Sequence, residues 1–126
     1  MKLLTISLGG AAGSLLRFWL STFVQGRVGT TFPLGTLSVN IIGSLLIGVL
    51  FILLQHRFNG SELARTFLIV GVLGGFTTFS AFSMDTINLV NTGFWYRAIV
   101  NIIVSVAACL VAVVAGMSLG KYLGNL

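Results

Sequence analysis

Four long apolar stretches, separated by short polar segments, dominate the hydropathy pattern of this chain. They predict helices at about residues 3–24, 34–54, 62–90 and 95–119. Each stretch is long enough to cross the hydrocarbon core of a bilayer, which takes about 20 apolar residues. The polar segments between them are too short to form a domain outside the membrane. The pattern therefore predicts an all-α membrane protein with a single transmembrane domain, residues 1–126.

Several residues at the ends of these stretches are typical of helix boundaries in a membrane. Pro33 falls where a first helical turn begins, a position that suits its missing N–H. Asn59-Gly60 is a turn signal, and Ser61 directly after it is a good first residue for the third helix. Trp95 and Tyr96 open the fourth helix at the depth where amphipathic rings anchor in the interface.

The third stretch contains an unusual run, Gly-Gly-Phe-Thr-Thr-Phe-Ser, at residues 74–80. Paired glycines followed by hydroxyl side chains favour an interruption, so we expect the third helix to break near residues 74–79. In lipid, a break is tolerated only inside protein or beside water. It would expose carbonyls on one side and N–H groups on the other, which makes it a candidate ion site of either sign at the membrane midplane. The alternative is that the glycines only allow close helix packing.

Acidic residues are too few to build a cation pathway, because Glu62 and Asp85 are the only two. A basic ring of the kind that lines many anion pores is also absent. The remaining candidates are neutral: Phe79 and Phe82 share a helix face, and the edges of aromatic rings are positive. Two such edges facing a narrow path would replace part of an anion's water shell.

Polar residues on other helices add candidates for the same path. Asn40, with Thr36 one turn earlier, forms a polar stripe on the second helix, and its amide can donate to an anion. Asn101 and Ser105 share a face of the fourth helix, which Cys109 continues. For each asparagine, the alternative is a hydrogen bond between helices.

Two charged residues within the apolar stretches leave alternatives open. Arg17 lies inside the first helix, where it either makes a structural contact or forms part of an anion vestibule. Asp85 is expected to pair with a basic residue that the sequence does not identify. No histidine stands near a nucleophile, since His56 is the only one and ends a helix, so we do not expect an enzyme.

Composition limits the class of protein further. Hydrophobic residues make up 56% of the chain and charged residues 7%, with a mean hydropathy of +1.08, whereas a soluble domain carries about 25% charged residues. The formal charge is +5, but the basic residues form no face with interleaved aromatics, which argues against nucleic acid as a partner. With one cysteine, Cys109, no disulfide forms within a chain. Arg17 interrupts the first apolar stretch, so we interpret it as a retained helix and not a signal peptide.

The loop charges give a weak signal for orientation. One side of the membrane would carry Lys2, Arg57, Arg65 and Lys121, and the other would carry Arg27 and Arg97. A difference of two fits a fixed orientation with the first side in the cytoplasm, and it also fits insertion in both orientations.

With these features the chain resembles a known family, the small fluoride channels of the Fluc (CrcB) type. The resemblance covers nearly the whole chain and rests on three runs: Gly9-Gly10 with Gly13 and Arg17, then residues 35–44 from Gly-Thr-Leu-Ser-Val-Asn to Gly-Ser, and above all residues 74–83, Gly-Gly-Phe-Thr-Thr-Phe-Ser-Ala-Phe-Ser. It implies a multi-pass protein of the cell (inner) membrane that lets fluoride leave passively. It also implies an antiparallel, dual-topology homodimer with two pores. In such a dimer, the chain inserts into the membrane in both orientations.

The resemblance also assigns roles to residues. It implies that Phe79, Phe82 and Asn40 line the fluoride pore, and that the backbone carbonyls of Gly74 and Thr77 from both subunits hold a structural sodium ion (Na+). The implied polar lining of the pore consists of Ser80, Ser83, Thr36, Asn101 and Ser105. Position 101 departs from the family, which often has a tyrosine there.

Two other functions compete with a fluoride channel. A small multidrug transporter is also a dually inserted protein of four helices, but it needs a membrane-embedded acid in the first helix, where this chain has Arg17 and no acid. A non-transporting subunit of a larger membrane complex would need neither the helix break nor the paired phenylalanines.

Overall fold

The structure is a computed structural model that describes residues 1–56 and 61–125. All of its regular elements are helices. The helices are α1 (Lys2–Val28), α2 (Leu34–His56), α3 (Glu62–Arg65), the π-helical segment η1 (Thr66–Leu73), α4 (Gly74–Phe76), α5 (Phe79–Asn91) and α6 (Trp95–Gly124). Within the described residues, four segments are long and apolar enough to cross a membrane: α1, α2, the run from α3 to α5, and α6. The prediction of an all-α chain with four such helices is confirmed. The expected turn at Asn59-Gly60 lies outside the described residues.

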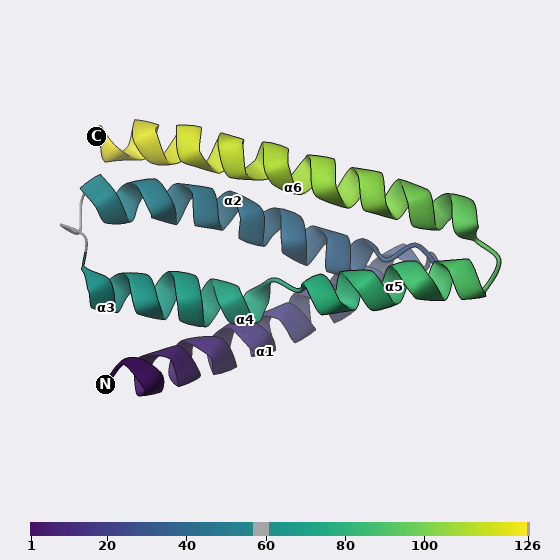
Figure 1. Ribbon diagram of the computed structural model, residues 1–126, viewed down its shortest axis with the longest axis horizontal. Helices are drawn as coiled ribbons and strands as arrows, with labels where there is room; N and C mark the ends of the chain where they lie inside the picture. Colours follow the sequence, from purple (N-terminus) through teal and green to yellow (C-terminus); the bar gives the residue numbers. More distant parts are fainter. Residues whose placement is uncertain (57–60, 126) are drawn as a thin grey trace.

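The four spans form an open bundle in which α1 is the most oblique (Figure 1). Helix α2 packs along α6, and α1 packs against η1, α4 and α2. Both chain ends lie at the same end of the bundle (Figure 1), as an even number of crossings requires. The connections between α1 and α2 and between α5 and α6 lie at the other end.

The side chain of Gln25 bridges the connection from α1 to α2. Its Nε2 donates to the carbonyls of Thr30 (2.7 Å) and Phe32 (3.1 Å), and its Oε1 accepts from the N–H of Gly35 (3.0 Å). Helix α1 ends at Gly29, whose φ of 58° lies in the left-handed region that glycine tolerates. These contacts fix the first turn of α2, which contains Thr36 and precedes the turn that carries Asn40.

Glycines let neighbouring helices approach to backbone contact. On α1, a Cβ atom at Gly9 would lie 2.8 Å from the Phe67 carbonyl oxygen, and one at Gly13 would lie 2.0 Å from that of Val72. Between α2 and α6, a Cβ at Gly48 would lie 2.3 Å from the Val113 carbonyl oxygen. Small residues at these positions allow helices to approach closely, and Gly9 and Gly13 do so here.

Substituting Gly13 with alanine is therefore expected to destabilise the fold. The new methyl group would collide with the Val72 carbonyl, which belongs to the backbone and cannot rotate away. We expect a loss of about 1–3 kcal/mol in the free energy of unfolding, the usual cost of overpacking. Gly26→Ala on the same helix is the matched control, because a Cβ there meets nothing within 4 Å. Unfolding in detergent measures both variants, and equal stability of Gly13→Ala and wild type would contradict the packing described.

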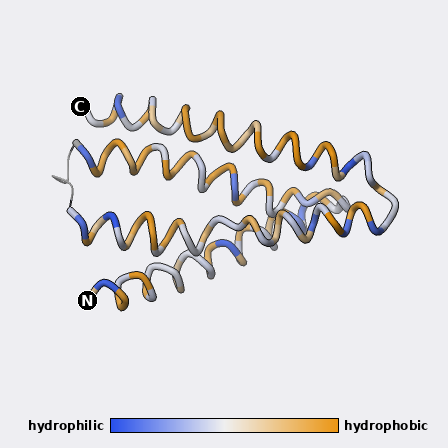
Figure 2. Tube along the Cα trace, viewed as in Figure 1, coloured by the Kyte–Doolittle hydropathy of each residue, from blue (hydrophilic) through white to orange (hydrophobic). Residues whose placement is uncertain are grey.

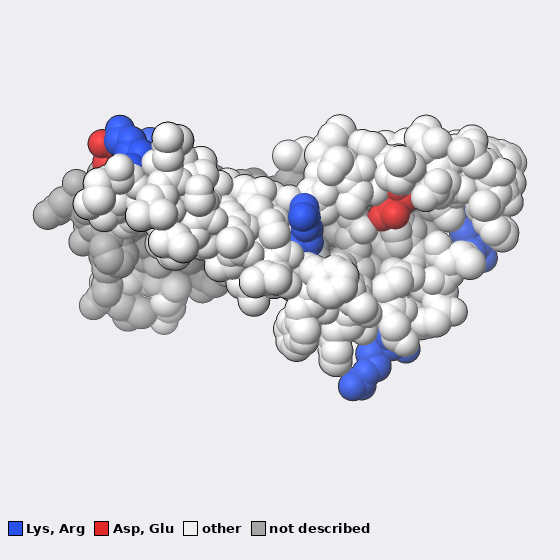
Figure 3. Space-filling model, turned by 90° about the horizontal axis from the view of Figure 1, so that it is seen from below, with Lys and Arg blue, Asp and Glu red and all other residues white. Residues whose placement is uncertain are grey.

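Little of the apolar surface is buried inside one chain. The core consists of Val39, Leu73 and Phe76, with Leu20 and Leu50 packed against it. Hydrophobic residues run along all four spans, and hydrophilic residues concentrate toward the helix ends (Figure 2). On the face shown in Figure 3, charged side chains form a few isolated spots on an otherwise uncharged surface. Lipid or another protein chain must cover most of this surface.

Candidate functional site

Thr77 and Thr78 interrupt the helical path between α4 and α5. Thr77 (φ −77°, ψ 156°) and Thr78 (φ −151°, ψ 114°) both have extended backbones. The hydroxyl of Thr78 then caps α5 by accepting from the N–H of Ala81 at 3.1 Å. Gly74 and Gly75 are helical, so the residues that leave the helix are the threonines. Gly75 serves the contact with α1, because a Cβ there would lie 2.6 Å from the Gly10 carbonyl oxygen.

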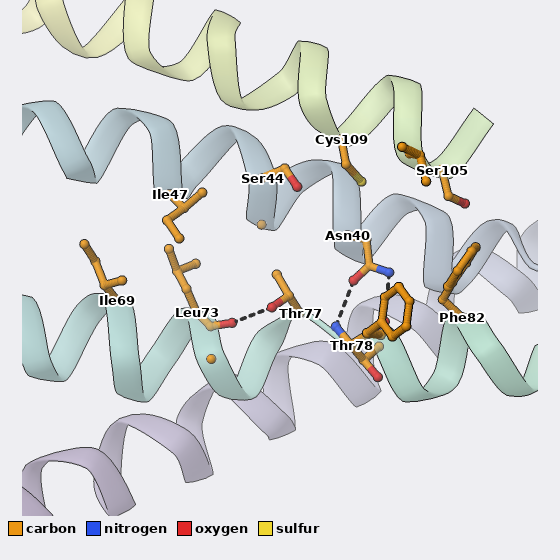
Figure 4. A pocket seen from close by; sticks show the side chains of 14 residues that line it. Asn40, Ser44, Ile47, Ile69, Leu73, Thr77, Thr78, Phe82, Ser105 and Cys109 are labelled. Carbon is orange, nitrogen blue, oxygen red and sulfur yellow. Dashed lines mark hydrogen bonds between the residues drawn. The ribbon is translucent and has the colours of Figure 1, made fainter. Parts of the chain in front are cut away.

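The side chain of Asn40 holds the extended segment in place from the neighbouring helix α2. Its Oδ1 accepts from the N–H of Thr78 at 2.8 Å, and its Nδ2 donates to the carbonyl of Thr78 at 3.0 Å (Figure 4). The amide thereby replaces both partners that a continuous helix would provide for this residue. Asn40 makes the interhelical hydrogen bond that was the alternative reading of this residue. Its second N–H is not used by either bond, which leaves one donor for a ligand.

Two backbone carbonyls beside the interruption lose their usual helical donors. In a continuous α-helix, the N–H of Thr78 would donate to Gly74 and the N–H of Ala81 to Thr77. Here those two N–H groups donate to Asn40 and to the Thr78 hydroxyl instead. Carbonyl oxygens freed in this way can coordinate a hard cation. They are the two carbonyls that the family resemblance assigns to sodium.

A groove of about 390 Å³ opens beside the interruption, between α2, α6 and the run from η1 to α5. Figure 4 shows Asn40, Thr77, Phe82 and Ser105 around it. Six of the predicted site residues line it: Asn40, Gly74, Thr77, Phe79, Phe82 and Ser105. The lining also includes Cys109, which continues the Ser105 face of α6, and Ser44, which the sequence analysis did not single out. Ser44 could have been found from its position four residues after Asn40, on the same face of α2.

The two phenylalanines form a pair at one end of the groove. Their ring centroids lie 5.3 Å apart, and their planes are inclined by 46°. Phe82 is partly buried, whereas 77% of the Phe79 surface is exposed. Rings tilted in this way present edges as well as faces to the groove between them and α6.

Hydroxyl groups near the pair differ in whether they have a proton to give. Ser83 donates its proton to the carbonyl of Phe79 at 2.9 Å, so it is already committed. Thr78 and Ser80 share one hydrogen bond of 3.2 Å in which either oxygen is the donor. Because two hydroxyls have two protons and this bond uses one, the pair keeps one proton for another acceptor. Neither Ser80 nor Ser83 lines the groove.

Thr36 lies away from the groove, in a different polar cavity. Its hydroxyl donates to Asp85 Oδ2 at 2.6 Å, and both residues line a space of about 530 Å³ near the connection between α1 and α2. The expected basic partner of Asp85 is not found within the described residues, where the one ion pair joins Lys2 and Glu62. A hydroxyl donor takes the place of a cation at this carboxylate.

Arg17 is half-buried on α1, on the other side of the interruption. It lines a cavity of about 180 Å³ together with Thr36 and Thr78. The side chain thus lies between the Thr36–Asp85 cavity and the extended segment, and not in the groove. This location leaves both readings of Arg17 open, because a vestibule and a structural contact would each place it beside the segment.

Asn101 is 1% exposed and does not line the groove. Its Nδ2 donates to the Thr86 hydroxyl at 2.9 Å, and its Oδ1 accepts from the Ser105 hydroxyl at 3.3 Å. The structure therefore places this residue behind the wall that Ser105 forms, within a network that joins α5 to α6. The sequence could not show this, because Thr86 lies on another helix.

Comparison with known proteins identifies sequences similar to this chain over nearly its whole length. A sequence model of the family described as "CrcB-like protein, Camphor Resistance (CrcB)" matches residues 4–117. A protein of Coxiella burnetii named "Fluoride-specific ion channel FluC" is 44% identical over 124 residues, covering 98% of this chain and 100% of that protein. Proteins with the same name from Magnetococcus marinus (42% identical, covering 96% and 98%) and Rhizobium meliloti (45% identical, covering 93% and 94%) are similar as well.

Proposed function

Because this chain belongs to the CrcB-like family, we propose that it is a fluoride channel, through which the ion leaves the cell down its gradient. The chain is a multi-pass membrane protein, and we place it in the inner membrane. The observation that carries the proposal is the groove at Thr77 and Thr78, which gathers Asn40, Phe79 and Phe82. The protein is not an enzyme, since an ion that crosses the membrane unchanged requires no bond to be made or broken. The match to a relative named as a fluoride-specific ion channel covers 98% of this chain and all of that relative.

The ion path would run along the groove past the phenylalanine pair. A small, strongly hydrated anion enters a narrow path only where donors replace its lost water. The ring edges of Phe79 and Phe82 supply partial positive charge, and the free N–H of Asn40 supplies one hydrogen bond. The spare proton of the Thr78–Ser80 pair lies within the same segment. All these donors are neutral, so none holds the anion as tightly as a fixed positive charge would.

A second copy of the chain, inserted in the opposite orientation, would complete the site. Phe79 stands 77% exposed at the rim of the groove, where lipid would be its alternative neighbour. The accessible surface of one chain is 7827 Å², whereas a compact monomer of this mass has about 6,500 Å². An antiparallel homodimer would cover this surface and contain two equivalent pores. Labelling of a tagged terminus from both sides of the membrane supports this arrangement, and labelling from one side alone contradicts it.

The centre of such a dimer fits a structural sodium ion. Each chain offers the carbonyls of Gly74 and Thr77, which have lost their helical donors, so two chains would offer four oxygens. Sodium is a hard cation that favours oxygen ligands. Within the described residues, no group of three or more histidine, cysteine or acidic side chains is placed to hold a metal ion.

Removal of sodium is expected to weaken the dimer. Replacing sodium with a large organic cation such as N-methylglucamine should shift purified protein from dimer to monomer in detergent, and returning sodium should reverse the shift. The measurement is the molecular mass of the protein component of the protein–detergent complex, in matched buffers of equal ionic strength. A dimer whose dissociation does not depend on sodium would argue against Gly74 and Thr77 as ligands, and would leave fluoride conduction standing.

Growth of cells provides a direct test of the proposed function. In cells that lack their own fluoride exporter, expression of this chain should restore growth in fluoride that otherwise stops it. Expression of Phe79→Ile/Phe82→Ile at the same membrane level is the control. If the wild-type chain reaches the membrane and gives no protection, fluoride export is not its function.

A further inference from the structure

A buried network joins Asn101 to the groove without placing it there. Three hydrogen bonds run in sequence: Ser105 donates to Asn101 (3.3 Å), Asn101 donates to Thr86 (2.9 Å), and Thr86 donates to the carbonyl of Phe82 (2.7 Å). Asn101 is 1% exposed, and Thr86 and Ser105 are each 7% exposed. The network therefore links α6 to the backbone of one of the two phenylalanines.

The direction of these bonds follows from the chemistry of their ends. The carbonyl of Phe82 can only accept, so the proton of Thr86 is used there, and the Thr86 oxygen must accept. The amide of Asn101 consequently turns its NH₂ to Thr86 and its oxygen to Ser105. Each group has one role that it can fill in this arrangement, so the loss of one leaves a buried partner unpaired.

We propose that Asn101 is a positioning residue, which holds Phe82 and the Ser105 hydroxyl in place and does not itself touch the ion. Through Thr86 it fixes the turn of α5 that carries the Phe82 ring, 5.3 Å from Phe79. Asn101 Oδ1 accepts the Ser105 proton and so keeps it away from the groove. The Ser105 oxygen then presents its lone pairs to the groove. The bond to Ser105 is the longest of the three, and it is the one that yields if Ser105 turns its proton to an anion. This inference rests on the proposed fluoride channel.

The test is a double-mutant cycle in fluoride efflux from liposomes. Asn101→Leu and Thr86→Val each remove the bond between the two side chains, and Thr86→Val keeps the shape of Thr86. We expect each to reduce efflux about tenfold, corresponding to about 1.4 kcal/mol in the barrier, and the double variant to be no slower than the slower single variant. Thr86→Ser keeps the hydroxyl and should conduct nearly as wild type. Asn101→Ala serves where Asn101→Leu fails to fold.

Three outcomes overturn the inference. Losses that multiply in the double variant would mean that Asn101 acts on the ion independently of Thr86. A Thr86→Ser channel as slow as Thr86→Val would mean that packing, and not the hydroxyl, matters. Efflux at the wild-type rate in Asn101→Leu would remove any role in conduction. If the wild-type protein conducts no fluoride, the proposed function fails. The same double-mutant cycle is then measured in the unfolding temperature. Additive shifts of the two single variants would contradict the coupling of Asn101 and Thr86.

Discussion

Replacing Phe79 or Phe82 with isoleucine is expected to reduce fluoride efflux about tenfold each, which corresponds to about 1.4 kcal/mol in the barrier. Replacing both is expected to reduce efflux further, but by less than the product of the two single losses, because the rings are in contact. Isoleucine is apolar and of similar bulk, but it has no positive edge to offer an anion that is losing water. The two rings lie 5.3 Å apart and line the same groove, so an ion in that path passes both. The efflux rate per folded protein in liposomes measures the effect.

The matched control is Phe51→Ile. Phe51 lies on α2 with 42% of its surface exposed, and it does not line the groove. It should conduct at the wild-type rate, which separates loss of an aromatic ring in the path from loss of one facing lipid. If both groove variants conduct as the wild type does, the aromatic edges do not contact the ion and the proposed path is wrong.

Asn40→Leu is expected to abolish conduction by releasing the extended segment. Both the N–H and the carbonyl of Thr78 would lose their partner, and each buried unpaired group costs about 1–3 kcal/mol. With its N–H free, Thr78 can return to the Gly74 carbonyl and continue the helix, which would remove the interruption. The expected results are a lower unfolding temperature in detergent and efflux at background level.

Two further variants separate the contributions of Asn40. Asn91→Leu is the matched control, because Asn91 is exposed near the end of α5 and the same substitution there should change neither quantity. Asn40→Asp keeps an oxygen for the Thr78 N–H and loses the donor, so it should retain more stability than Asn40→Leu while conducting poorly. Conduction by Asn40→Leu at the wild-type rate would show that the two hydrogen bonds between Asn40 and Thr78 are not needed for conduction.

The spans were predictable because lipid leaves few alternatives. A chain with 7% charged residues and four apolar stretches must satisfy its backbone groups internally, and the helix is the solution that short connections allow. An interruption in this region was expected from the sequence, because glycines and hydroxyl side chains cluster there. Its position at Thr77 and Thr78 was not, since it depends on Asn40 from α2 and on the fit of Gly75 against Gly10 of α1.

The same distinction holds for the candidate site. Phe79 and Phe82 share a helix turn, so their pairing follows from local spacing. Helix face grouped Thr36 with Asn40 and Asn101 with Ser105, and the family resemblance placed all four in the pore lining. Thr36 and Asn101 instead bond to Asp85 and Thr86 on α5, and neither lines the groove. Partners on other helices are long-range contacts, which periodicity along one helix does not reveal.

Efflux of fluoride from liposomes containing the purified protein tests the central claim most directly. An ion-selective electrode records the release after the membrane potential is short-circuited, and chloride release is recorded in parallel. Rapid release of fluoride with chloride retained, and release near background for Phe79→Ile/Phe82→Ile, is the result expected from a groove lined by neutral donors. Fluoride release no faster than from empty liposomes, or chloride release at the same rate as fluoride, would contradict it.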